Sequence, residues 1–124
     1  MARILVVDDD PDVVTMVTLS LKKAGHAVTA AASREDGMRQ VKAANPELIL
    51  LDIMMAEPDD GIAMAQDLRR QGFDKPILIM SSIDKVTGMS YGRDDEMLPV
   101  DDFVEKPVKS ATLIKKINDL LASR

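Results

Sequence analysis

The stretch Glu47-Leu48-Ile49-Leu50-Leu51-Asp52 decides the fold of this chain. Its four aliphatic residues run without a break, which indicates a strand buried on both faces, as in a parallel sheet. Asn45-Pro46 precedes the run, and the turn-forming segment 56–61 follows it. Ligands of open α/β sheets bind beyond the carboxyl ends of the strands, and Asp52 stands at that end. An Asp in this position more often only begins a turn, so the rest of the chain has to decide its role.

Strands and helices alternate along the whole chain. The other predicted strands are Arg3–Val7, Ala27–Ala31, 76–80 and Asp102–Lys106. Apolar residues at helical spacing predict helices at 11–24, 34–44, 61–71 and 109–122. This alternation is typical of a parallel sheet covered on both faces by crossover helices. We therefore expect one domain over residues 1–124, with a flavodoxin-like, doubly wound, five-stranded sheet in the order 2-1-3-4-5.

The first two helices have recognisable ends. Asp10 is the expected N-cap of the first helix, and Gly25 its stop. Ser33 caps the second helix, which ends at Asn45-Pro46. The residues expected on the buried face of the first helix are Val13, Val14, Met16, Val17, Leu21 and Ala24.

Composition restricts the chemistry. The chain of 124 residues has no Cys and one His, which excludes thiolate metal sites and argues against a histidine-rich one. Any metal would be bound by oxygen, which favours magnesium or calcium. The net charge of −5 argues against direct binding of nucleic acid. No long apolar segment and no signal peptide are visible, so we expect a cytoplasmic protein that does not bind a membrane.

Polar residues follow four of the predicted strands. They are Asp8 and Asp9, Asp52, Ser81, and Lys106. All these strand ends lie at one edge of a parallel sheet, where three carboxylates would repel one another unless a divalent cation such as Mg²⁺ joined them. The alternative is that Asp8 and Asp9 only favour the start of the first helix through its dipole, although Asp10 can do that alone.

The chain resembles the receiver domains of two-component response regulators, which are CheY-like. The matching stretches are Ile-Leu-Val-Val-Asp-Asp at 4–9, Leu-Leu-Asp at 50–52 with Met55 and Gly61 downstream, Pro-Ile-Leu-Ile-Met-Ser at 76–81, and Phe-Val-Glu-Lys-Pro at 103–107. The match covers essentially the whole chain. Each motif alone is weak, but the set in this order and spacing is specific.

The resemblance implies a phosphoryl acceptor and a metal site. Asp52 would take a phosphoryl group from the phosphohistidine of a sensor histidine kinase or a phosphotransfer protein. Asp8, Asp9, Asp52 and the backbone carbonyl of Met54 would hold Mg²⁺. Lys106 would pair with the phosphoryl oxygens. The domain is then a signalling phosphoacceptor and not an enzyme, beyond its own phosphorylation and dephosphorylation.

The resemblance also implies a switch. Ser81 would hydrogen-bond the phosphoryl group, and Phe103 would turn inward into the space that Ser81 leaves. A downstream protein, which the sequence does not identify, would read the changed surface. We expect a monomer; a phosphorylation-dependent dimer through the face of the fourth helix is the alternative.

The chain departs from the family pattern in three places. Ala56 stands where receivers commonly have proline, and the acids after it are read as solvated loop charge. Segment 83–100 lacks helical periodicity, so a short, displaced or irregular fourth helix is expected there. Met54 and Ile83 are apolar at positions that tune hydrolysis of the phosphoaspartate, which predicts slow self-dephosphorylation.

Two other functions compete with a phosphorylated receiver. A phosphatase of the haloacid-dehalogenase type also uses an Asp after its first strand, a Ser or Thr, and a Lys. Its nucleophile motif fails here at Asp12, and it would leave Asp52 without a role. A receiver-like binding module that is never phosphorylated is the other alternative, against which the complete set of acids and lysine argues.

Overall fold

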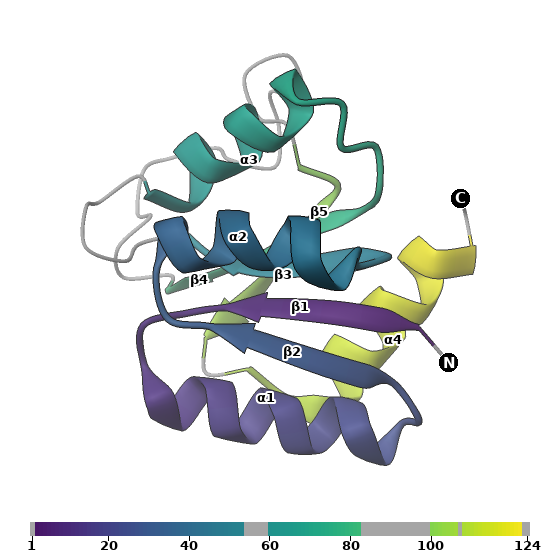
Figure 1. Ribbon diagram of the computed structural model, residues 1–124. Coiled ribbons are helices and arrows are strands. Elements are labelled where there is room, and N and C mark those ends of the chain that lie inside the picture. Colours follow the sequence, from purple (N-terminus) through teal and green to yellow (C-terminus); the bar gives the residue numbers. More distant parts are fainter. Residues whose placement is uncertain (1, 54–59, 83–99, 107, 123–124) are drawn as a thin grey trace.

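The computed structural model describes residues 2–53, 60–82, 100–106 and 108–122 (Figure 1). Its strands are β1 (Arg3–Val7), β2 (Ala27–Ala31), β3 (Leu48–Asp52), β4 (Ile77–Ser82) and β5 (Asp102–Lys106). They form one parallel sheet in the order β2-β1-β3-β4-β5, which confirms the expected fold class. The helices are α1 (Pro11–Lys23), α2 (Arg34–Ala44), α3 (Asp60–Arg70) and α4 (Ser110–Ala122). Residues 83–99, where the irregular fourth helix is expected, lie outside the described part.

Two apolar layers hold the helices to the sheet. Helices α1 and α4 cover one face, and α2 and α3 cover the other (Figure 1). Successive residues of each strand alternate between the two cores, so Leu48 and Leu50 face α1 and α4 while Ile49 and Leu51 face α2 and α3. Every residue of β3 is buried, as its unbroken apolar run predicts.

The helix ends form as their local sequence predicts. The Asp10 side chain accepts a hydrogen bond from the amide two residues on, at 2.9 Å, and Ser33 accepts one from the amide three residues on, at 3.1 Å. Asn45 ends α2 in the left-handed conformation, with φ of 49°. Gly25 follows α1 with φ of 91°, a conformation that glycine adopts without strain.

Two residues expected on the buried face of the first helix, Met16 and Ala24, are exposed, and Ala24 is the C-cap of α1 and not part of the helix. Val17 and Leu21 are fully buried and define the inward face of the helix, whereas Met16 is 38% exposed. A helix turns by about 100° per residue, so the position before Val17 falls on the flank. Leu19, on the outer side, is 59% exposed. Within the described residues, no helix has the length and apolar character needed to span a membrane.

Candidate functional site

Strand register places two carboxylates side by side. Val6 of β1 pairs with Leu50 of β3, and both face the core beneath α1 and α4. Two residues on, each strand reaches a carboxylate on that same face, because side chains alternate with a period of two. These are Asp8 and Asp52, which are 1% and 4% exposed. Two acids are thus buried next to each other at the carboxyl edge of the sheet.

One ammonium group lies between these carboxylates. Val104 of β5 faces the same core, and Lys106 follows it by two residues. Lys106 Nζ lies 3.1 Å from Asp52 Oδ1, in a hydrogen bond, and 3.0 Å from Asp8 Oδ2, in an ion pair. The sequence predicts this meeting of strand ends, but it does not reveal that Lys106 bridges the two acids.

The environment of Lys106 fixes its charge. Burial of the ammonium group lowers the pKa of Lys106, but the carboxylates of Asp8 and Asp52 outweigh that effect and hold the pKa above its usual value. Opposite charges within a few ångströms favour the charged form. Lys106 therefore stays protonated throughout the physiological pH range.

A third carboxylate completes an acidic cluster that fits a hard cation. One oxygen from each of Asp8, Asp9 and Asp52 lies within 4.8 Å of the others, and Asp9 is exposed to solvent. Asp8 Oδ1 accepts a hydrogen bond from the Asp10 amide at 2.9 Å. Asp8 Oδ2 is buried and forms the ion pair with Lys106 Nζ. It accepts no hydrogen bond from the described residues. Such oxygen donors suit Mg²⁺, which binds a few carboxylates and retains several waters.

The remaining predicted site residues are placed only in part. Ser81 lies in β4, opposite Glu105 of β5, and its side chain is not described. Phe103 is partly buried and packs against the core beneath α2 and α3. Met54 and Ile83 lie outside the described residues, so the carbonyl ligand and the slow dephosphorylation stay predictions.

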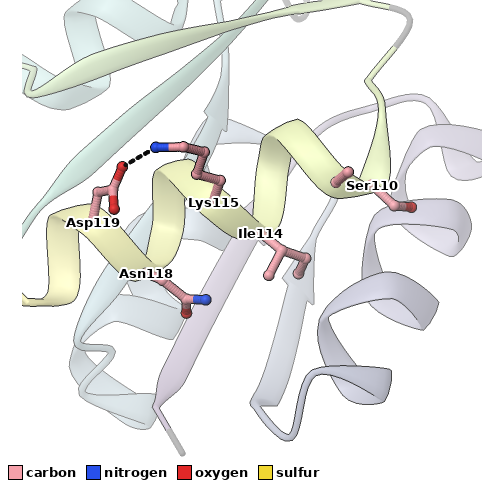
Figure 2. A pocket seen from close by; sticks show the side chains of 6 residues that line it. Ser110, Ile114, Lys115, Asn118 and Asp119 are labelled. Carbon is pink, nitrogen blue, oxygen red and sulfur yellow. Dashed lines mark hydrogen bonds and ion pairs between the residues drawn. The ribbon is translucent and has the colours of Figure 1, made fainter.

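Two of three surface hollows on the described part of the molecule lie at residues of the candidate site. One of about 350 Å³ includes Asp8 and Asp9 in its lining, and one of about 650 Å³ includes Phe103 and Lys106. The described residues that line a third hollow, of about 600 Å³, all belong to α4 (Figure 2). This hollow contains the exposed Lys115–Asp119 ion pair, and none of the acidic cluster reaches it. We therefore take the first two hollows, and not the third, as the surroundings of the site.

The fold and its acidic edge are those of a signalling domain in the receiver class. The family model of the response regulator receiver domain matches residues 4–118, and the chain belongs to this family.

Relatives with known names agree with this assignment. The chain is 36% identical over 99 residues to the alkaline phosphatase synthesis transcriptional regulatory protein PhoP of Bacillus subtilis. The matched region covers 77% of this chain and 41% of PhoP. The chain is 33% identical over 124 residues to protein PilH of Pseudomonas aeruginosa, with 98% of this chain and 99% of PilH covered. The chain spans about half the length of the transcriptional regulators that it matches, at 41% and 52% for two of them.

A solved structure agrees as well. The receiver domain of the Francisella response regulator 1452 is 27% identical to this chain and has a TM-score of 0.83. The match covers 99% of this chain and 98% of that one.

Proposed function

We propose that this chain is a phosphorylated switch whose acceptor is the Asp52 carboxylate. The donor is a phosphohistidine on a sensor histidine kinase or a phosphotransfer protein. The observation that carries the proposal is the burial of Asp52 with Lys106 Nζ at 3.1 Å and the oxygens of Asp8 and Asp9 within 4.8 Å. A buried acid surrounded in this way is held in one place and faces positive charge.

The geometry suits an in-line displacement at phosphorus. A carboxylate oxygen of Asp52 forms the new P–O bond while the P–N bond to the donor imidazole breaks. The released nitrogen keeps the electron pair of the broken bond, and the imidazole leaves neutral because its other ring nitrogen already carries a proton in the phosphohistidine. Lys106, which remains protonated, neutralises charge on the equatorial phosphoryl oxygens. Mg²⁺, held by Asp8, Asp9 and Asp52, would supply further neutralisation when bound. The protein thus contributes positioning and charge, the two requirements of phosphoryl transfer.

The product differs from the starting state in charge and in contacts. A phosphoryl group on Asp52 adds negative charge beside Lys106. The ammonium group of Lys106 then pairs with the phosphoryl oxygens in place of the Asp52 carboxylate. We infer that Ser81 and Phe103 respond as the switch, and that a downstream protein reads the changed surface. The domain acts as a monomer in this proposal and contacts no nucleic acid itself.

Phosphorylation by a small donor tests the proposal. Purified protein is incubated with acetyl phosphate and Mg²⁺, and its intact mass is measured over time. We expect one phosphoryl adduct on the wild type, none on Asp52→Asn, and none when a chelator removes Mg²⁺. Asp119→Asn is the matched control, because Asp119 is an exposed acid on α4 and does not belong to the acidic cluster. It should react like the wild type.

These mass measurements, together with an assay of phosphate release from a phosphate ester by the same two proteins, separate the competing functions. Sustained release of phosphate from a phosphate ester by Asp52→Asn would favour the phosphatase. A wild type that takes up no phosphoryl group, although it is folded, would favour the binding module. An adduct on both Asp52→Asn and the wild type would place the acceptor elsewhere.

A further inference from the structure

The start of α3 is seated directly on the backbone that carries Asp52. Gly61 is the second residue of α3 and is buried. Its amide donates a hydrogen bond to the carbonyl of Ile53 at 3.0 Å. A Cβ at Gly61 would lie 2.2 Å from the Asp52 carbonyl oxygen and 2.6 Å from Ile53 Cα. Both contacts are with backbone atoms, so no side-chain rotation relieves them.

Gly37 offers a direct comparison within the same molecule. It is also buried in a helix, α2, and a Cβ there would lie 2.8 Å from Met64 Cε and 3.2 Å from the methyl groups of Val7. Met64 Cε is the far end of a flexible side chain, which moves aside at small cost. Substitution of Gly37 therefore repacks side chains, whereas substitution of Gly61 has to move the main chain.

The main chain that an added Cβ at Gly61 would clash with carries the proposed acceptor. The Asp52 carbonyl and the Asp52 carboxylate belong to one residue, and that carboxylate lies 3.1 Å from Lys106 Nζ. Displacing the peptide between Asp52 and Ile53 shifts the carboxylate relative to Lys106 and Asp8. Phosphoryl transfer depends on such distances, and a misplacement of about 1 Å can slow a reaction by roughly 100-fold.

We propose that Gly61 is a positioning residue for Asp52. Because Gly61 has no Cβ, α3 can begin in contact with the Asp52–Ile53 peptide. This backbone contact fixes the position of the Asp52 carboxylate within the acidic cluster. The inference rests on the proposed function, since the consequence that matters is the rate of phosphoryl uptake by Asp52. It adds a residue that acts through the position of Asp52 and not in the chemistry itself.

Two alanine variants test this inference. Gly61→Ala, Gly37→Ala and the wild type are compared in three measurements: phosphoryl uptake from acetyl phosphate with Mg²⁺, unfolding by urea, and affinity for Mn²⁺ from the electron paramagnetic resonance of the free ion. Mn²⁺ binding reports on the cluster without any phosphoryl chemistry. We expect Gly61→Ala to take up phosphate about 10- to 100-fold more slowly than the wild type and to bind Mn²⁺ more weakly. Gly37→Ala should match the wild type in both, even where its urea midpoint falls.

The outcomes separate this inference from the proposed function. A reactive wild type with an equally reactive Gly61→Ala variant, and equal Mn²⁺ affinities, would overturn the role of Gly61 alone. An equal loss of uptake and affinity in Gly37→Ala would also overturn it, because the effect would then be general loosening. A wild type that does not react contradicts the proposed function, and the Mn²⁺ affinities then still decide whether Gly61 positions the cluster.

A measurement on the wild type covers the case in which Gly61→Ala does not fold. The chain has six glycines, so labelling with ¹⁵N-glycine gives a simple amide spectrum. Titration with Mg²⁺ should move the Gly61 resonance and leave those of Gly37 and Gly72 in place. The shift should be absent in Asp52→Asn. A Gly61 resonance that ignores Mg²⁺ in the wild type would overturn the inference.

Discussion

At the scale of single residues, Lys106 determines whether the acidic edge is stable. Its ammonium group lies within 3.1 Å of carboxylate oxygens from both Asp8 and Asp52, and both acids are buried. Removing one partner from a buried ion pair leaves an uncompensated charge, which costs far more than the pair itself contributes. Substitution of Lys106 and substitution of Asp52 should therefore have unequal effects on the free energy of unfolding.

Lys106→Ala should destabilise the metal-free protein, while Asp52→Asn should not. The first leaves two adjacent buried carboxylates without a counter-charge, for a loss of about 3 kcal/mol in the free energy of unfolding. The second keeps the Lys106–Asp8 pair and removes one of the two negative charges. Urea unfolding in the presence of a chelator measures both. Lys115→Ala, which removes an exposed partner of Asp119, is the control and should change little.

A stability of Lys106→Ala equal to that of the wild type would show that solvent or a rearrangement replaces the ammonium group. A large loss in Asp52→Asn would show that the Asp52 carboxylate, and not the balance of charges, supports the fold. Either result would contradict the bridging role of Lys106 in the metal-free state.

At the scale of elements, one arginine joins the end of α3 to the beginning of β5. Arg69 donates hydrogen bonds to the carbonyls of Phe73 and Lys75 at 2.9 and 2.8 Å, and to Asp101 Oδ2 at 3.0 Å. Its guanidinium group also lies 5.9 Å from the centre of the Phe73 ring. Asp101 in turn accepts the amide of Ile77, the first residue of β4, at 2.8 Å. The connection thus fixes where β4 and β5 start.

Arg69→Lys should destabilise the fold by about 2 kcal/mol, because an ammonium group cannot reproduce the planar fork of donors and leaves backbone carbonyls unpaired. Chemical denaturation measures the loss. Arg70→Lys, at the next position, is the matched control: Arg70 is exposed and pairs with Asp67 on the surface of α3. It should cost much less. Equal losses in the two variants would show that the fork geometry of Arg69 is unimportant.

At the scale of the whole molecule, His26 links stability to pH. It is the single histidine of the chain, and no other unperturbed side chain titrates between about pH 5 and 8. His26 Nδ1 accepts a hydrogen bond from the Ala2 amide at 3.1 Å, which requires the unprotonated nitrogen. Burial lowers the pKa of His26, and the nearby Glu47 carboxylate opposes this only in part.

The wild type should lose stability as the pH falls from about 7.5 to about 5.5, and His26→Asn should lose less. A group whose pKa is lower in the folded state stabilises that state above its unfolded value of 6.5, and this contribution is lost as the pH drops through the folded value. Asn keeps an acceptor near the position of Nδ1 but carries no titrating proton. The urea midpoints of the two proteins, measured across this pH range, test the prediction. If both midpoints fell equally with pH, a role for His26 would be contradicted.

Much of this molecule follows from local sequence. The buried run of β3, the caps at Asp10 and Ser33, and the left-handed Asn45 depend on residues within one turn of each other, so their effects are visible in the chain itself. The alternation of elements then restricts the sheet to a few topologies, since parallel strands need crossover connections of one hand. That topology alone predicts that the residues after four strands meet at one edge of the sheet. Asp8, Asp9, Asp52 and Lys106 are those that the structure shows to do so.

Other features depend on the packing of distant segments. Met16 has an apolar side chain at nearly the right spacing, yet the angle at which α1 rests on the sheet leaves it exposed. Arg69 and Asp101 are 32 positions apart, and no periodicity connects them. The close approach of Gly61 to the Asp52 backbone depends on where α3 begins relative to β3, which is a matter of tertiary distance.

The sequence by itself determined the alternation of strands and helices and the set of acids and lysine at the carboxyl edge of the sheet, because the first follows from periodicity and the second from the rule that parallel strands end together. Only the tertiary structure decided that one ammonium group lies between Asp8 and Asp52, and that Gly61 admits the α3 backbone against Asp52. Lys106 and Asp52 are 54 positions apart in the chain, and Gly61 and Asp52 are 9 apart. Contacts over such separations depend on side-chain direction and on tertiary packing, which the local sequence pattern does not determine.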